Sequence, residues 1–207
     1  MKRFVIAVTR TCGSGATSIC KLLAKDYGIN LYDKELLRLA SEDSGISERL
    51  FREADEKLME TNLFRASKKV YTGGLIPPES NNFESDENLF NFQAKVLKEL
   101  AEMESYICIG RAADFVLKDK LNVFKIFVYA PEASCIAREM HRLNITYDEA
   151  KKWIRKTDKY RTEYYKYHTG RDWRNPYNYD LCLNTGDVPY ERCAEIIKAF
   201  VAQRMAE

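Results

Sequence analysis

The chain has 207 residues, of which 45% are hydrophobic and 31% charged, and its formal net charge is +2. This composition is typical of a globular protein and excludes disordered, collagen-like and membrane-spanning classes. No apolar run approaches the roughly 18 residues that a spanning helix needs, and a net charge so small predicts no bulk attraction to nucleic acid. We therefore expect a single cytoplasmic domain with neither a membrane nor a nucleic acid as its partner.

Short apolar runs rich in β-branched residues alternate with helical patterns along the chain. This alternation predicts βαβ units around a parallel sheet. The predicted strands are residues 4–8, 29–32, 106–109, 123–129 and 180–183.

Capping signals place helices between these strands, and each signal has a physical basis in the free polar groups at a helix end. The predicted helices are one from about Gly15 to Tyr27 closed by Gly28, one after Ser85, one opened by Pro131 and Glu132, a long one from a Thr146–Glu149 capping box to about Tyr165, and a last one from Pro189.

Two stretches do not fit the rhythm of strands and helices. Residues 72–87 combine Gly-Gly, Pro-Pro and polar residues, and residues 167–179 are rich in aromatic side chains and arginine. Loops of this length in a compact domain are usually functional lids or mobile segments. The six cysteines form no C-x-x-C pair and no zinc-like spacing with the two histidines, so we expect free thiols.

The stretch VIAVTRTCGSGATS, residues 5–18, has the strand, loop and helix order of a phosphate-binding P-loop. When the pattern G-x-x-x-x-G-K-[ST] is aligned on Gly15, Thr17 takes the hydroxyl position, but Arg10 replaces the first glycine and Ala16 the lysine. A glycine loop at a helix N-terminus still offers backbone N–H groups to phosphate. The residues that would contact it are Thr11, Gly13, Ser14, Gly15, Ala16 and Thr17.

Polar residues also follow the other predicted strands, at the edge where open parallel sheets bind ligands. Asp33 could serve a metal or an acceptor hydroxyl, Gly110-Arg111 offers a guanidinium for a second anion, and residues 184–187 follow the last strand. Each feature alone has an ordinary explanation as a turn, a helix cap or a salt bridge. Their occurrence together at strand ends favours a binding site.

Nearly the whole chain resembles the P-loop nucleoside monophosphate kinases, and among them the cytidylate-kinase-like branch. The most specific stretch is IGRAADFVLKDKLNVFKIFVYAPEASCIARE, and GINLYDKELLRLA, RKTDKYR and YDLCLNTG are similar to further family segments. The resemblance implies an α/β fold of the P-loop nucleoside triphosphate hydrolase type, with three α/β/α layers and a five-stranded parallel sheet. It implies a core at about 1–40, 86–145 and 178–207, a helical acceptor-side insertion at about 41–85 and a lid at about 146–177.

The resemblance also implies roles for particular residues, with ATP as the donor and Mg²⁺ as the metal. Arg111 would bind the acceptor phosphate, while Asp158 and Arg161 match an Asp-x-x-Arg lid pattern whose arginine closes over the transferred phosphoryl group. Arg38 is the nearest candidate for a further acceptor-binding arginine, and Arg155 lies one position off the register of another. Thr17 and Asp33 would contact magnesium.

Besides Arg10 in place of the first glycine, the chain departs from the family pattern at three positions. Ala16 replaces the lysine, Ile109 replaces an aspartate of the magnesium shell, and Ala112 replaces an aspartate that helps to recognise the base. We hypothesise that Arg10 supplies the missing positive charge and that Asp33 takes over part of the magnesium shell. The rival interpretation is that Arg10 merely pairs with a carboxylate.

Two functions follow from these patterns. The first is an ATP-dependent phosphotransferase acting on a small acceptor, foremost a nucleoside monophosphate, and the retained Arg111, Asp158 and Arg161 favour it. The second is a nucleotide-binding sensor or interaction protein that has lost catalysis, which the missing lysine and aspartate favour. Nucleic-acid binding through the basic, tyrosine-rich run 138–174 is disfavoured, because its apolar positions are spaced for a packed helix face.

Overall fold

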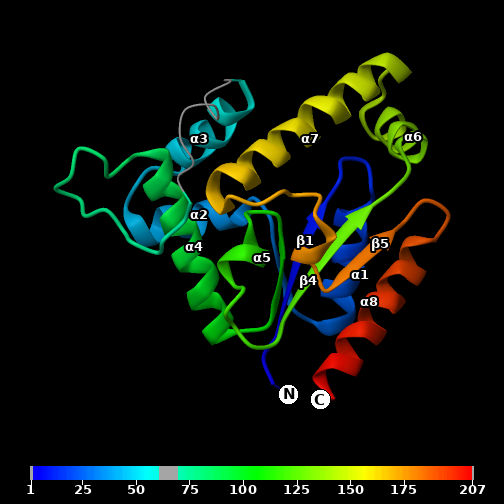
Figure 1. Ribbon diagram of the computed structural model, residues 1–207, viewed down its shortest axis with the longest axis horizontal. Helices are drawn as coiled ribbons and strands as arrows, with labels where there is room; N and C mark the ends of the chain where they lie inside the picture. The colour runs from blue at the N-terminus through cyan, green and yellow to red at the C-terminus, as the bar shows by residue number, and fades with distance from the viewer. Residues whose placement is uncertain (1, 61–69, 207) are drawn as a thin grey trace.

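The computed structural model describes residues 2–60 and 70–206. One sheet of five parallel strands, in the order β2-β3-β1-β4-β5, forms its centre (Figure 1). Strand β1 therefore lies between β3 and β4, with Ile6 paired to Ile107 on one side and to Phe124 on the other. The five predicted strands are confirmed, as β1 Val5–Arg10, β2 Asn30–Tyr32, β3 Tyr106–Ile109, β4 Val123–Tyr129 and β5 Leu181–Asn184.

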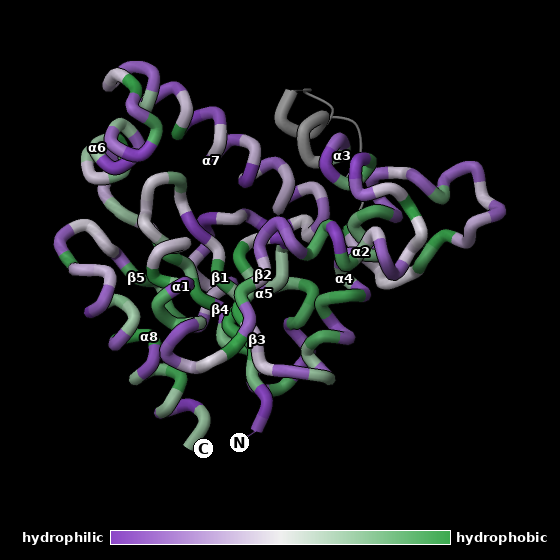
Figure 2. Tube along the Cα trace, turned by 180° about the vertical axis from the view of Figure 1, so that it is seen from behind, coloured by the Kyte–Doolittle hydropathy of each residue, from purple (hydrophilic) through white to green (hydrophobic). Residues whose placement is uncertain are grey.

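Helices cover both faces of the sheet and make the predicted three layers. Because successive strand residues point to opposite faces, Ile6 and Val8 pack with one helical layer while Val5 and Ala7 pack with the other. The first layer is α1 (Ala16–Tyr27) with α8 (Tyr190–Met205), and the second contains α4 (Asp86–Met103) and the short α5 (Ala113–Val116). Figure 2 shows the hydrophobic residues gathered in the strands and in the helix faces that touch them.

Helices α2 (Glu35–Ser44) and α3 (Glu48–Glu60) lie to one side of the sheet, next to an irregular segment at 70–85 (Figure 1). This segment, predicted as a loop, is anchored by the buried Asn88. Its side-chain oxygen accepts from the Ile76 amide at 2.8 Å, and its amide nitrogen donates to the carbonyls of Ile76 and Phe83. The asparagine supplies the backbone pairing that a neighbouring strand would otherwise provide.

Helix α7 (Tyr147–Thr169) follows α6 (Glu132–Leu143) and crosses the carboxyl edge of the sheet, opposite the two chain ends (Figure 1). The predicted capping box of Thr146 and Glu149 is confirmed. The helix ends at Thr169, later than the predicted end near Tyr165, because Tyr164 and His168 continue its buried face into an aromatic cluster. The irregular segment after it contains a 3₁₀ turn at Pro176–Asn178. Among the described helices, none is long and apolar enough to cross a membrane.

His168 is buried between α7 and α4, where its ring stacks on Phe90 with 3.9 Å between ring centroids. Burial lowers the pKa of His168 from 6.5 to about 3, so the folded chain holds it neutral where the unfolded chain binds a proton. The contribution of neutral His168 to the free energy of unfolding is fully present above pH 6.5 and is lost as the pH falls below that value. The buried Asp114 has the opposite effect on the pH dependence of stability, because burial raises its pKa to about 6 and the folded chain then binds a proton more readily than the unfolded chain.

We predict that His168→Phe, which retains the stack on Phe90, weakens the loss of stability in acid. Between pH 6 and pH 5 the free energy of unfolding of the wild type should fall by about 1 kcal/mol more than that of the variant. The reason is that the wild type takes up a proton at His168 on unfolding and the variant does not. Urea denaturation at the two pH values measures this difference, and the contribution of Asp114 cancels in the comparison. Parallel pH profiles for the two proteins would contradict the neutral assignment.

Candidate active site

Three cavities open at the carboxyl edge of the sheet. The loop cavity, about 850 Å³, is lined by residues 10–18 and by parts of α6 and α7. The arginine cavity, about 230 Å³, lies between the ends of β1 and β3 and one face of α7. The side cavity, about 990 Å³, lies on the opposite face of α7, against the ends of β4 and β5. Helix α7 thus separates the arginine cavity from the side cavity.

The glycine loop between β1 and α1 has the geometry of an anion site. Gly15 adopts a left-handed conformation, with φ of +80°, and a Cβ atom there would overlap the ring of Tyr190. Helix α1 begins at Ala16, so its first N–H groups have no acceptor within the helix and carry the positive end of the helix dipole. Thr17 is exposed in the same cavity. Phosphate is the ligand that such a helix start suits.

Three other elements hold this loop from outside. The Thr185 hydroxyl donates to the Ser14 carbonyl at 2.6 Å, and the Arg138 guanidinium donates to the carbonyls of Gly13 and Thr185. On the other side, an oxygen of Asp158 accepts from the Cys12 amide at 2.8 Å. These bonds preorganise the loop. The sequence patterns pointed to the segment that contains Thr185 but not to Arg138, whose contacts have no local signal.

Arg10 extends from the end of β1 toward β3 and lines both the loop cavity and the arginine cavity. Its guanidinium lies against Gly110, where any Cβ atom would overlap it, and its Nη2 atom is 3.8 Å from an oxygen of Asp33. Burial lowers the pKa of Arg10 to about 10, the nearby Arg161 and Arg111 lower it further, and Asp33 opposes them. Arg10 therefore stays charged at neutral pH.

Arg111 and Arg161 complete the cationic wall of the arginine cavity. Arg111 has a left-handed backbone conformation, with φ of +58°, which is uncommon for residues other than glycine. Strained conformations of this kind concentrate at functional sites. Arg161 donates to the Arg10 carbonyl at 3.2 Å and to Asp158 at 3.3 Å. Three guanidinium groups from β1, the β3 end and α7 therefore face one small cavity.

The structure brings together most, but not all, of the predicted site residues. Arg10, Asp33, Arg111 and Arg161 line the arginine cavity, and residues 11–17 line the loop cavity. Asp158 lies behind the loop. Arg38 is on the exposed face of α2, paired with Glu42, and Arg155 is on the side-cavity face of α7, so neither joins the arginine cavity.

A magnesium ion is compatible with this arrangement. Thr17 and Asp33 line the same loop cavity, and Mg²⁺ commonly takes few protein oxygens, keeping waters and substrate phosphates as its other ligands. A cage of three or more His, Cys, Asp or Glu side chains does not occur in the part of the chain that the structure describes. All six cysteines are free, as predicted, and burial raises the pKa of Cys20 and of Cys108 to about 12, so neither is a ready nucleophile.

A protein-family model described as the cytidylate kinase-like family matches residues 5–187. No curated protein has a significantly similar sequence.

Solved structures share the fold over nearly the whole chain. An uncharacterized protein from Eubacterium ventriosum has a TM-score of 0.71 and 24% identity, covering 97% of this chain and 99% of that one. Shikimate kinase from Bacteroides thetaiotaomicron has a TM-score of 0.54 and 13% identity, covering 96% and 98%. A gluconokinase from Sinorhizobium meliloti has a TM-score of 0.50 and 13% identity, covering 98% and 93%. The fold is that of the P-loop kinases.

The hydrogen bond between Asp158 and the Cys12 amide predicts a specific change in loop protection. Asp158→Ala leaves a buried N–H group without its acceptor, at a cost of about 1–3 kcal/mol, so hydrogen exchange of the Cys12 amide should accelerate about 10-fold or more. Asp158→Asn retains an oxygen acceptor and should restore most of the protection. Equal exchange in all three proteins, measured by NMR, would show that the contact does not hold the loop.

Proposed function

Because this chain belongs to the cytidylate kinase-like family, we propose that it transfers the γ-phosphoryl group of ATP to a small acceptor, foremost a nucleoside monophosphate. The observation that carries the proposal is the convergence of Arg10, Arg111 and Arg161 on one cavity beside the glycine loop. Phosphoryl transfer depends mainly on positioning and charge stabilisation, and this arrangement supplies both.

The charge balance of the arginine cavity favours an acceptor that carries phosphate. Four cationic side chains, Arg10, Lys34, Arg111 and Arg161, line it together with the carboxylate of Asp33. The three arginines are only partly accessible to water, and cations so placed that repel one another are costly unless an anion offsets them. A phosphate dianion supplies the missing negative charge, and guanidinium groups bind it through paired hydrogen bonds.

Each residue then has a role in the transfer. The backbone of the glycine loop binds the donor phosphates. Thr17 and Asp33 would hold Mg²⁺, which would neutralise charge on those phosphates. Arg111 orients the acceptor phosphate. Arg10, at the junction of the two cavities, replaces the lysine of the P-loop pattern, and Arg161 stabilises the phosphoryl group in flight. Helix α7 covers the reacting groups and limits access of water.

We predict ADP release that depends on both ATP and a nucleoside monophosphate. Arg111→Ala and Arg161→Ala should each lower kcat/KM by about 100-fold or more, since each removes a cation from the transferred or accepting phosphate. Arg192→Ala, at an exposed position of α8, is the matched control and should behave as the wild type. A coupled assay across the common nucleoside monophosphates measures these rates. Wild-type kinetics in both cavity variants would refute the site.

The substitution of Arg10 for the lysine is tested by binding of ATP. Arg10→Ala should weaken the affinity for ATP by about 10-fold, the loss typical of a charged hydrogen bond. Calorimetric titration with Mg²⁺ and a non-hydrolysable ATP analogue measures the change without turnover. If the affinity is unaltered, Arg10 serves only as the partner of Asp33.

The alternative is a nucleotide-binding sensor or interaction protein on the same fold. It is favoured by Ala16, which leaves the loop without its lysine, and by Ile109, which is fully buried where the family carries an aspartate. In this case the protein binds ATP and shows no turnover with any nucleoside monophosphate.

A further inference from the structure

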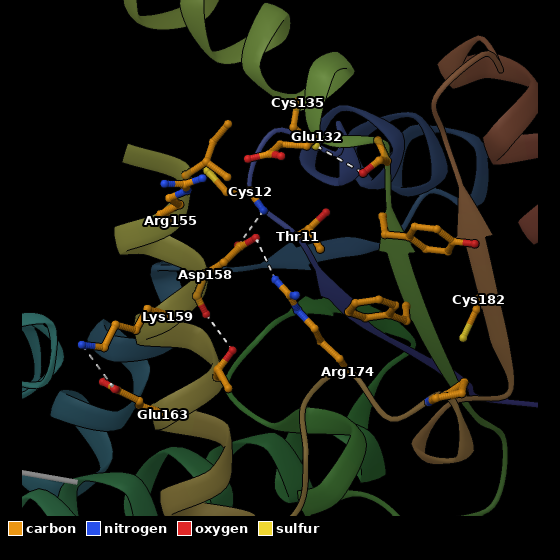
Figure 3. A pocket seen from close by; sticks show the side chains of 16 residues that line it. Thr11, Cys12, Glu132, Cys135, Arg155, Asp158, Lys159, Glu163, Arg174 and Cys182 are labelled. Atoms are coloured by element: carbon orange, nitrogen blue, oxygen red, sulfur yellow. Dashed lines mark hydrogen bonds and ion pairs between the residues drawn. The ribbon is translucent and has the colours of Figure 1, made fainter. Parts of the chain in front are cut away.

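The side cavity has no part in the proposed phosphoryl transfer. Its volume of about 990 Å³ is at the upper end of the range for small-molecule sites. It has no lining residue in common with the arginine cavity, and it shares with the loop cavity only the wall formed by Thr11 and Cys12. It is therefore a separate compartment on the far side of α7 (Figure 3).

The floor of the side cavity is aromatic. Phe127 and Tyr129, from the end of β4, are stacked with ring centroids 6.0 Å apart and an interplanar angle of 21°. Phe127 is buried and also stacks on Tyr179, so the open part of the floor is Tyr129, which is 37% exposed. The exposed Cys182 of β5 is paired with Phe127 and lines the same cavity. Flat aromatic faces of this kind favour a planar ring, which gains both apolar burial and stacking.

The other walls carry cations whose own partners are distant. Lys159 is 3.8 Å from Glu163, and Arg174 is 3.9 Å from Asp158, both too far for a hydrogen bond. Arg155 has no ion pair with any of the side chains that the structure describes, those of residues 2–54 and 70–206. The Lys159 and Arg174 side chains are themselves 65% and 64% exposed, and ion pairs at such distances contribute little to stability, so these donors remain available to an anion.

Carboxylates restrict where that anion can lie. Glu132 is on the α6 wall near Cys135, whereas Arg155 and Arg174 approach from α7 and from the segment after it (Figure 3). Asp158 and Glu163 lie on the α7 wall itself, so an anionic group is repelled from Glu132 and from these two carboxylates. It is attracted only to the exposed ends of Arg155 and Arg174. The aromatic floor and the two arginines then define both ends of one ligand.

We propose that the side cavity binds a planar aromatic anion of nucleotide size, with its ring on the exposed face of Tyr129 and its anionic group at the exposed ends of Arg155 and Arg174. The ligand also bears on the glycine loop. Asp158 forms part of the same wall and holds the Cys12 amide, so an anion that draws Arg174 away from Asp158 changes the support of the loop. Occupancy of the side cavity therefore adjusts affinity in the loop cavity.

Cys182 provides a direct reporter, because it is the one exposed cysteine of the six and lines the side cavity. The rate of its alkylation by N-ethylmaleimide, followed by mass spectrometry on the intact protein, is measured with AMP, adenosine, inorganic phosphate or terephthalate. AMP should slow alkylation in a saturable manner, whereas adenosine and phosphate, which each lack one half of the ligand, should not. Protection by terephthalate and not by AMP would support an aromatic carboxylate as the source of the anion.

Variants separate this site from the proposed acceptor site. Arg155→Gln and Arg174→Gln should each weaken protection by about 10-fold, while Lys156→Gln, an exposed neighbour on α7 outside the cavity lining, should have no effect. Protection should survive in Arg111→Ala, which disables the arginine cavity.

Three results would overturn the proposal. They are no protection by AMP or terephthalate, equal protection by phosphate alone, and loss of protection in Arg111→Ala with retention in Arg155→Gln. Because the readout is alkylation of Cys182, it does not depend on whether the protein transfers phosphate.

Discussion

The hydrogen bond from the Cys12 amide to Asp158 fixes helix α7 to the glycine loop, and the arrangement of all three cavities depends on it. Asp158 also accepts from Arg161, which in turn donates to the Arg10 carbonyl at the end of β1. These three hydrogen bonds join strand β1, the glycine loop and helix α7. The bond is buried, where water cannot replace a lost partner, so its loss costs more than that of an exposed contact.

The arginine cavity, next to these hydrogen bonds, departs from what selection for stability alone would produce. Protein interiors pair buried charges or exclude them. Here the half-buried Arg10 lies near two other guanidinium groups that lower its pKa, and Arg111 adds an uncommon backbone conformation. Local violations of this kind concentrate at functional sites, where a ligand supplies the missing partner. The apolar core on both faces of the sheet offsets the free energy lost by placing these like charges close together.

Apolar periodicity and strand ends are local signals, and they were sufficient to predict the five strands and the edge at which the polar residues gather. The three layers were implied by the family resemblance. The short α5 carried no such signal and was not predicted. The supports of the loop from Arg138 and Thr185 join segments distant in sequence, through side-chain contacts that have no period.

The two arginines that lie outside the arginine cavity show a different limit. Family resemblance grouped Arg155 with Arg161, but six residues of helix place them about 120° apart, on opposite flanks of Asp158. Arg38 similarly lies on the exposed side of α2, since Leu36, Leu37 and Ala40 form its buried face. Helical phase separates these residues, whereas alignment to a motif does not.

The contact between Arg10 and Gly110 links the size of the side chain at position 110 to the position of the Arg10 charge. The guanidinium occupies the space that any larger residue at 110 would need. The φ of +78° at Gly110 strains any other residue there, whatever the space around it. A Cβ atom at this position would in addition push the flexible end of Arg10 aside. A substitution at 110 therefore strains the backbone and also moves a positive charge of the arginine cavity.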